Sequence, residues 1–265
     1  MRTIKLLFKV IKYQFFAELE YPGAYMAGII AQWLLYGVQM AVLVLTIWNF
    51  GNLAGYYPVE VVFLFAVWLL TYALAATFTY NICRNFDQMV ISGTMDEALV
   101  RPMPPFLYLL ATNVNVGYIS HITLTTAVLG VSIWSLGLVW SVFEWLWLFV
   151  MLVAGSVITG CIMLIVNFPA MRTRSRSPFS PLFWETRVFT QYPINIYPGI
   201  LQFIFTAVIP LAFINFYPAQ VLLGRQDGLW TPVTMWLSPA VAALLVGITA
   251  FFWRRMSKFY ESAGT

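Results

Sequence analysis

Residues 59–82 read VEVVFLFAVWLLTYALAATFTYNI, and Glu60 is the only charged side chain among them. About 20 apolar residues in an α-helix are enough to cross the roughly 30 Å of hydrocarbon in a bilayer. The apolar residues are continuous rather than alternating with polar ones, which favours a helix over a strand of a membrane β-barrel. This stretch therefore predicts a transmembrane helix.

The rest of the chain has a similar composition. Of its 265 residues, 61% are hydrophobic and 9% are charged. A soluble domain of this length has too little interior to bury that much apolar surface. We therefore predict an all-α integral membrane protein in which residues 1–265 form a single transmembrane domain. Its six predicted spans lie roughly at residues 23–48, 59–82, 115–138, 144–168, 198–217 and 233–253.

Basic residues indicate how these spans are oriented. Those at positions 2, 5, 9 and 12 share one face of a helix, which predicts an amphipathic interfacial helix over residues 1–20 rather than a frayed tail. With the N-terminus in the cytoplasm, every Lys and Arg except Arg225 lies in a cytoplasmic segment. Because Lys and Arg resist translocation, we expect a multi-pass protein of the inner (plasma) membrane with both termini in the cytoplasm.

Motifs that carry chemistry are missing from the sequence. It contains no GxxxxGK[ST] phosphate loop and no Gly-rich dinucleotide loop. One histidine and two isolated cysteines suggest no metal site, and the predicted spans bury almost no acid for ion coupling. The basic residues form no single patch for nucleic acid. We predict no catalytic residue, metal or cofactor in this chain, so energy for uphill transport would come from a partner.

One connector is unusually polar for such a chain: residues 90–102, VISGTMDEALVRP. Gly93 can turn the chain, and Thr94 can cap a short helix that begins near Met95. Pro102 ends it, because the residue before a proline is pushed out of the helical conformation. The pattern predicts a helix of about two turns lying across the membrane face.

The side chains of this helix suit a docking element. Asp96 and Glu97 lie in its first turn, where carboxylates complement the helix dipole, and Met95 and Leu99 lie four residues apart on one side. An apolar knob flanked by charges suits a groove on a soluble protein. An ordinary interfacial loop is an equally good interpretation of these residues alone.

Two blocks of sequence resemble a known family. The first is Ser92-Gly93-x-x-Asp96-x-x-Leu99-x-Arg101-Pro102, and the second runs from FTQYPINIYP at residues 189–198 through IPLAF at 209–213 to YPA at 217–219. In this order, on this topology, they resemble the ABC-2 type permeases, in particular a branch formerly of unknown function. The arginine-rich stretch 171–181 departs from that pattern, and either a membrane anchor or a regulatory contact fits it.

The resemblance implies a six-helix architecture of the ABC-2 (type V exporter) kind. It also implies the membrane subunit of an ATP-driven exporter, which pairs with an identical or related second permease and with separate ABC ATPase subunits that bind ATP and Mg²⁺. In such families the first cytoplasmic loop carries the helix that couples to the ATPase. The corresponding residues here are Gly93, Met95, Asp96, Glu97, Leu99, Arg101 and Pro102.

Polar residues within or next to apolar spans are the guide to a substrate path. We take as candidates Asn113, His121, Asn167, Gln191, Tyr192 and Asn195. Tyr192-Pro193 and Tyr197-Pro198 should interrupt helix, and broken helices in membranes often line cavities. Hydrogen bonding between helices is the alternative role for each candidate. The lack of buried charge favours an amphipathic or apolar substrate.

Other functions without a separate ATPase are less well supported. A membrane enzyme or lipid-handling protein would need a catalytic set, and one histidine with no paired membrane carboxylates does not provide it. A secondary carrier would bury acids in its spans. An ABC-2 permease therefore remains the leading prediction.

Overall fold

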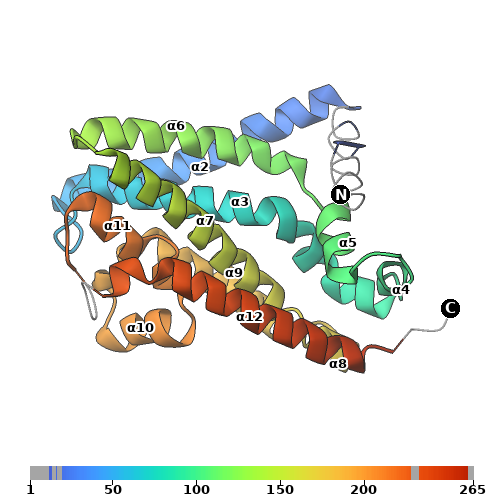
Figure 1. Ribbon diagram of the computed structural model, residues 1–265. Helices are drawn as coiled ribbons and strands as arrows, with labels where there is room; N and C mark the ends of the chain where they lie inside the picture. The colour runs from blue at the N-terminus through green and yellow to red at the C-terminus, as the bar shows by residue number, and fades with distance from the viewer. Residues whose placement is uncertain (1–11, 14–15, 17–19, 228–232, 262–265) are drawn as a thin grey trace.

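The computed structural model describes residues 12, 13, 16, 20–227 and 233–261 (Figure 1). The regular elements in this part of the chain are all helices. This confirms the predicted all-α class. Most of the interfacial helix predicted over residues 1–20 lies outside the described residues.

Five helices are long and apolar enough to cross a membrane, and they run side by side in Figure 1. They are α2 (Pro22–Phe50), α3 (Pro58–Ile91), α6 (Ile119–Leu136), α7 (Val142–Ile165) and α12 (Ser238–Met256). A proline in the first turn of α2, α3 and α12 begins each of these helices with its preset φ. The protein is thus a multi-pass membrane protein. Its two ends are named below after the first and last residues of α3, the Pro58 end and the Ile91 end.

Helix α3 forms the centre of the bundle. It is buried along most of its length and packs against α6 and α7. The approach to α7 depends on Gly155, where a Cβ would lie 2.5 Å from the Ile214 carbonyl oxygen and 2.8 Å from Cγ2 of Thr71. Helix α2 is different, because only 6% of its most apolar window is buried. It packs loosely at the edge of the bundle and leaves most of its surface available to lipid or to another subunit.

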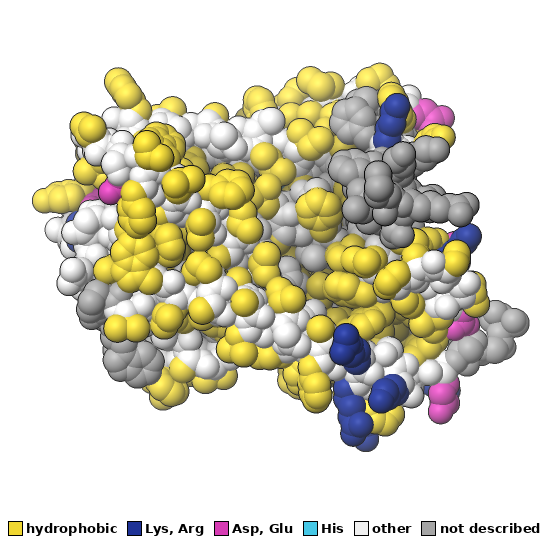
Figure 2. All heavy atoms as spheres, in the orientation of Figure 1, with side chains coloured by type: hydrophobic (Ala, Val, Ile, Leu, Met, Phe, Trp, Pro, Cys, Tyr) yellow, Lys and Arg dark blue, Asp and Glu magenta, His cyan; other side chains and the backbone are white. Residues whose placement is uncertain are grey.

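Short helices and basic side chains gather at the Ile91 end. Helices α4 (Met95–Leu99), α5 (Pro105–Thr112) and α8 (Ala170–Thr173) lie there beside the last turns of α12. Figure 2 shows almost all of the visible Lys and Arg side chains at this end, while the middle of the molecule is largely hydrophobic. This distribution is typical of a membrane protein with one strongly basic face.

In chain order the fifth crossing of the bundle, between α7 and α12, is made by residues 177–196 rather than by a regular helix. It consists of α9 (Phe179–Thr186) and the 3₁₀-helices η2 (Arg187–Gln191) and η3 (Ile194–Ile196). Its residues contact α3, and the loop before α3, at steadily earlier positions. The contacts are Ser177 N–H to Asp87 Oδ1 (3.2 Å), the rings of Trp184 and Tyr80 (5.8 Å between centroids), the guanidinium of Arg187 over Tyr72 (4.3 Å) and the Asn195 amide to the Ala54 carbonyl (3.2 Å).

Length explains why this crossing is irregular. From Pro58 to Asp87, α3 measures about 44 Å, whereas a helix over the roughly 18 steps from Ser177 to Asn195 would measure only about 27 Å. The chain makes up the difference with 3₁₀ turns, which rise about 2.0 Å per residue, and with extended residues. Tyr192 and Tyr197 are extended, each before a proline, as the sequence predicted.

The range 198–217, expected as a straight span, has a different structure. It contains α10 (Gly199–Phe203), a π-helix (Ile204–Val208) and the 3₁₀-helix η5 (Leu211–Phe213), and the chain continues into α11 (Phe216–Leu223). A bend of 76° separates Gly199–Val208 from Leu211–Leu223. Both halves lie at the Pro58 end in Figure 1. We therefore describe residues 199–223 as a re-entrant pair. A helix cannot continue through Pro210, which lacks an N–H.

An ion pair fixes the re-entrant pair to α3 at the Pro58 end. Arg225 donates from Nε and Nη2 to the two carboxylate oxygens of Glu60, at 2.7 and 2.8 Å. This bidentate bond raises the pKa of Arg225. The amide of Gln220 donates to the Tyr56 hydroxyl at 2.7 Å. The basic residue that the sequence placed alone on its side of the membrane is thus neutralised by an acid.

Candidate functional site

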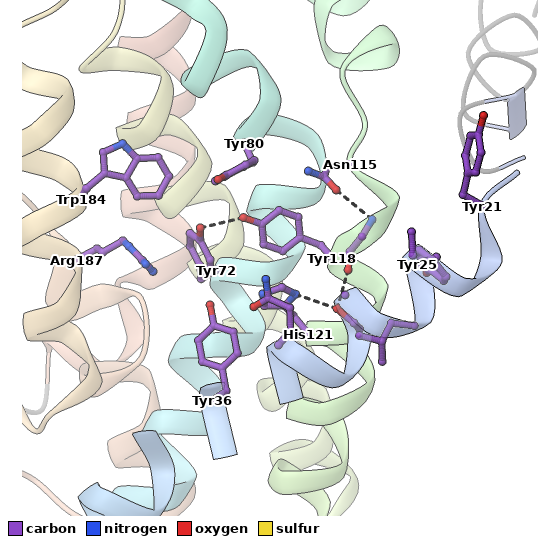
Figure 3. A pocket seen from close by; sticks show the side chains of 16 residues that line it. Tyr21, Tyr25, Tyr36, Tyr72, Tyr80, Asn115, Tyr118, His121, Trp184 and Arg187 are labelled. Atoms are coloured by element: carbon purple, nitrogen blue, oxygen red, sulfur yellow. Dashed lines mark hydrogen bonds between the residues drawn. The ribbon is translucent and has the colours of Figure 1, made fainter. Parts of the chain in front are cut away.

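A cavity lies between α2, α3, α6 and the fifth crossing (Figure 3). Its volume is about 730 Å³, within the range of small-molecule sites. We call it the aromatic cavity, because its wall is made mostly of rings. The large side chains in the wall are Tyr21, Tyr25, Tyr36, Tyr72, Tyr80, Tyr118, His121, Trp184 and Arg187.

Hydrogen bonds and ring contacts hold the α3–α6 side of the cavity together. The hydroxyl oxygens of Tyr72 and Tyr118 are 3.0 Å apart and share a hydrogen bond. The His121 ring packs between Tyr36 and Tyr118, with centroids 5.0 and 4.6 Å away. Its Nδ1 lies 3.2 Å from the hydroxyl of Ser120. These contacts make the wall rigid and leave polar atoms facing the hollow.

Arg187 enters the cavity from the fifth crossing, and Figure 3 shows it reaching toward Tyr72. Its guanidinium carbon is 4.3 Å from the Tyr72 centroid, 5.4 Å from Trp184 and 5.8 Å from Trp68. Trp68 also donates from Nε1 to the Arg187 carbonyl at 3.2 Å. Because Tyr72 lies near the middle of α3, Arg187 is deep in the bundle. Arg187 was predicted to lie in a cytoplasmic loop and instead lies beside the middle of α3.

Two smaller hollows continue along the fifth crossing. The entrance hollow, about 460 Å³, lies toward the Ile91 end and shares Tyr80 and Trp184 with the aromatic cavity. The far hollow, about 400 Å³, lies toward the Pro58 end. There Gln39 of α2 donates to Gln191 of η2 at 2.7 Å. We call the three hollows beside the fifth crossing the polar route. The Tyr80–Trp184 contact separates the first two, and the far hollow, at the glutamine pair, is lined mainly by apolar side chains.

Only some of the predicted path residues line this route. His121 faces the aromatic cavity, and Gln191 and Tyr192 line the far hollow. The others form hydrogen bonds elsewhere: the side-chain amide of Asn113 donates to the Leu109 carbonyl (2.9 Å), that of Asn167 to Met163 (2.8 Å) and that of Asn195 to Ala54 (3.2 Å). Asn113 and Asn167 thus bond to a carbonyl four residues earlier rather than to another helix, and Asn195 bonds to the loop before α3.

Most residues of the aromatic cavity were not predicted from the sequence. Tyr36, Tyr72 and Tyr118 read as ordinary residues of apolar spans, and Trp184 and Arg187 read as parts of a loop. The available signal was the segment 182–198, which combines aromatic, amide and X-Pro residues with one arginine. That mixture is too polar for a span facing lipid, and it suits a segment that crosses the membrane beside a cavity.

An apolar groove of about 520 Å³ lies elsewhere on the bundle, between α3, α5, α7 and α12. It is lined by Phe78, Phe106, Leu110, Val246 and Trp253 among others, and Arg254 lies at its edge. It offers almost no polar atom for recognition. This groove matches the acyl chains of lipid rather than a selected solute.

The short helix predicted from residues 90–102 is present as α4, Met95–Leu99, which is shorter than the expected two turns. Gly93 has φ of 76°, a conformation in which glycine is unstrained. One prediction about its faces is wrong: Met95 is 1% exposed and packs in the core, while Leu99 is 44% exposed. The first turn of so short a helix is covered by its neighbours, so Leu99 and Val100 form the exposed apolar surface.

Glu97 ties α4 to its surroundings. Arg101 Nη2 and the Tyr108 hydroxyl both donate to Glu97 Oε1 at 2.8 Å. The bonds from Arg101 and Tyr108 hold the pKa of the Glu97 carboxyl below its ordinary value. Arg101 also lies over the Tyr108 ring, 5.6 Å from its centroid. The exposed end of α4 is thus held against α5.

The arginine-rich loop 171–181 is linked to α4 through the C-terminal segment. Arg174 forms an ion pair with Glu261, and Arg172 lies 5.3 Å from the Phe259 ring centroid. Burial and the nearby Asp96 carboxylate raise the pKa of Tyr260 to about 12. The loop, α4 and the chain end therefore form one surface at the Ile91 end.

Comparison with known proteins agrees with this architecture. Residues 33–264 match the family described as ABC-2 family transporter protein. No curated protein and no solved structure matches the chain. The family match covers most of a helical bundle with several membrane spans, and the chain therefore belongs to the ABC-2 family of transporter proteins, as a membrane permease.

Proposed function

We propose that this permease is the membrane subunit of an ATP-driven exporter and that its substrate moves along the polar route beside the fifth crossing. The observation that carries the proposal is the arrangement of that route and α4. The entrance hollow opens near Asp87 and Arg176 at the Ile91 end, and α4 lies at the same end. Helix α4 follows α3 directly in the chain, so a force applied to α4 would be transmitted to α3. Residues of α3 line the aromatic cavity and the entrance hollow, but not the far hollow.

The Ile91 end would face the cytoplasm of a cell whose inner (plasma) membrane holds the protein, with both chain termini on that side. The gathering of basic side chains there supports this orientation. It places α4 where a soluble ATPase can reach it. Separate ABC ATPase subunits would bind ATP and Mg²⁺, since this chain carries no phosphate loop.

A second permease, identical or related, would complete the route. The fifth crossing exposes Leu182, Val188 and Phe189, and its Glu185 is also exposed. Glu185 lies between the residues that contact Tyr80 and Tyr72, so it is well inside the bundle's length. A carboxylate at that depth is costly against lipid. Another subunit covering this face, with water between the two, would remove that cost.

The test is to alter the exposed end of α4 in the assembled complex. Leu99→Ala removes an apolar contact but keeps the Arg101–Glu97 ion pair, and Arg101→Glu reverses a charge. We expect both variants to insert normally and to lose substrate-stimulated ATP hydrolysis, with the larger loss for Arg101→Glu. Arg254→Glu, a charge reversal in the last turn of α12 at the same end, is the matched control, because Arg254 forms no ion pair with α4 among the described residues.

Two results would overturn this proposal. One is normal stimulated hydrolysis in both α4 variants. The other is labelling of a cysteine introduced at Val100 by a membrane-impermeant reagent applied outside intact cells. Val100 is 79% exposed, and the native cysteines Cys83 and Cys161 are buried, so the introduced thiol would report its own side of the membrane.

A further inference from the structure

Arg187 is a charge inside the membrane domain that has no counter-ion among the described residues. Among the described residues it forms no ion pair, and no Asp or Glu lines the aromatic cavity. Glu185, two residues away, is exposed and is not part of the wall. Arginine keeps its proton in proteins, so this cationic group is permanent. Intramembrane charges of this kind are costly unless something pairs with them.

The surroundings hold the guanidinium by its faces and leave donors free. Tyr72 and Trp184 lie 4.3 and 5.4 Å from its carbon, which stabilises the cation through the rings. The Nε and Nη1 atoms are buried and have no hydrogen-bond partner in the described part of the chain. Nε and Nη1 lie on different edges of the guanidinium, so each can donate one charge-assisted hydrogen bond to an oxygen of a carboxylate or a phosphate.

We infer that the aromatic cavity binds an amphipathic organic anion, with its carboxylate or phosphate on Arg187 and its apolar or aromatic body against the tyrosine wall. This deepens the proposed function by naming the substrate class of the same route. A volume of about 730 Å³ accommodates a drug-sized molecule. Tyr36 and His121 offer ring faces next to the arginine. A cation is disfavoured, because it would meet an unneutralised guanidinium.

The test compares two probes that differ in charge and little else, 1-naphthaleneacetate and 1-naphthaleneacetamide. Their binding is measured by equilibrium dialysis on the purified complex in nanodiscs of neutral phosphatidylcholine. We expect the acetate to bind at least about tenfold more tightly, as for a hydrogen-bonded charge pair. Arg187→Gln should abolish this preference, Arg187→Lys should keep part of it, and Arg172→Gln, outside all three hollows, should leave it unchanged.

A second arm separates the sources of the anion. Adding phosphatidylglycerol to the nanodiscs displaces the acetate if the natural ligand is a lipid headgroup, and leaves its binding unchanged if the ligand is a soluble organic acid. Either result is consistent with the anion site. Equal binding of the two probes to the wild-type complex would overturn the inference, even if Arg187→Gln fails to assemble.

Failure of the inference and failure of the proposed function give different results. Anion binding without an ATPase in the purified complex would reject the exporter and keep the anion site. ATP hydrolysis that depends on α4, together with equal affinity for the acetate and the amide, would keep the exporter and reject the anion site. A preference for an aromatic cation such as 1-naphthylmethylammonium would also reject it.

Discussion

Helix α3 contributes to two hollows of very different character. In the aromatic cavity it presents Tyr72 and Tyr80 beside an arginine, a histidine and several hydroxyls. In the apolar groove it presents Leu74, Ala75 and Phe78, and the opposite walls offer mainly aliphatic and aromatic carbon. The two sets of residues are interleaved along the same turns of the helix, so the difference comes from which face they occupy.

The difference shows how one membrane helix can serve two environments. Hydrogen bonds around the aromatic cavity join different elements, as between Tyr72 and Tyr118 or Trp68 and Arg187. Around the apolar groove, Thr249 and Ser156 donate to carbonyls one turn earlier in their own helices. Polar groups facing lipid are best satisfied within their own helix. Polar groups that face a cavity can form hydrogen bonds with other elements, and the N–H groups of Arg187 remain available for a ligand.

Placing a bulky side chain in the aromatic cavity or in the apolar groove should give the largest difference, measured as the affinity for 1-naphthaleneacetate. Gly28 lines the aromatic cavity, and a Cβ there would meet nothing within 4 Å. Gly28→Trp should therefore fold and weaken 1-naphthaleneacetate binding by more than about tenfold, because it occupies the ligand's volume. Val246→Trp in the apolar groove is the matched variant and should leave binding intact. Loss of binding in Val246→Trp alone would reverse the assignment of the two hollows.

The second-largest effect is expected at Gly155, where α7 approaches Thr71 of α3 and the Ile214 carbonyl closely. Gly155→Ala places a methyl group 2.5 Å from a backbone oxygen, and such overpacking costs about 1–3 kcal/mol. We expect a lower midpoint in thermal unfolding followed by size-exclusion chromatography. Gly247→Ala in α12, where a Cβ meets nothing within 4 Å, should be neutral or slightly stabilising. Equal midpoints for the two variants would show that the bundle accommodates the added methyl group without loss of stability.

Removing one hydroxyl at the aromatic cavity and one at the apolar groove should give a smaller difference in stability. Tyr72→Phe breaks the bond to Tyr118, and such bonds between membrane helices average about 0.6 kcal/mol and reach about 1.7 kcal/mol. Thr249→Val removes a bond within one helix and should cost less. A double-mutant cycle of Tyr72→Phe with Tyr118→Phe should give a coupling energy of the same size. Additive losses in that cycle would mean that the two hydroxyls are not bonded to each other.

Lowering the pH should have the smallest effect, and we expect it in α4 and α5 at the Ile91 end. The folded-state pKa of Glu97 is lowered by the bonds from Arg101 and Tyr108. Its stabilisation is therefore complete above the ordinary glutamate pKa and is lost as pH falls below about 4.3 toward the lowered value. Amide hydrogen exchange in α4 and α5 should then accelerate. In the Glu97→Gln variant, the amides of α4 and α5 should exchange faster at neutral pH and should not accelerate further in acid. An exchange profile identical to that of the wild type would contradict a stabilising role for the bonds from Arg101 and Tyr108 to Glu97.

Much of the helical framework could be predicted from sequence. Continuous apolar runs identified the ranges where α2, α3, α6, α7 and α12 lie, and the glycine and proline of residues 90–102 predicted α4. These features depend on neighbouring residues and on the length of hydrocarbon to be crossed. The burial of Met95 could not be predicted, since it depends on what packs over the first turn of α4.

The sequence by itself determined that the chain is a membrane protein, because a surface this apolar is stable against lipid and not against water. It also located the X-Pro breaks, since proline removes a donor wherever it stands. Only the tertiary structure decided that residues 177–196 cross the bundle and that residues 199–223 turn back. It alone placed Arg187 beside Tyr72. A polar crossing is stable only against partners that satisfy it, and those partners come from helices far away in the chain.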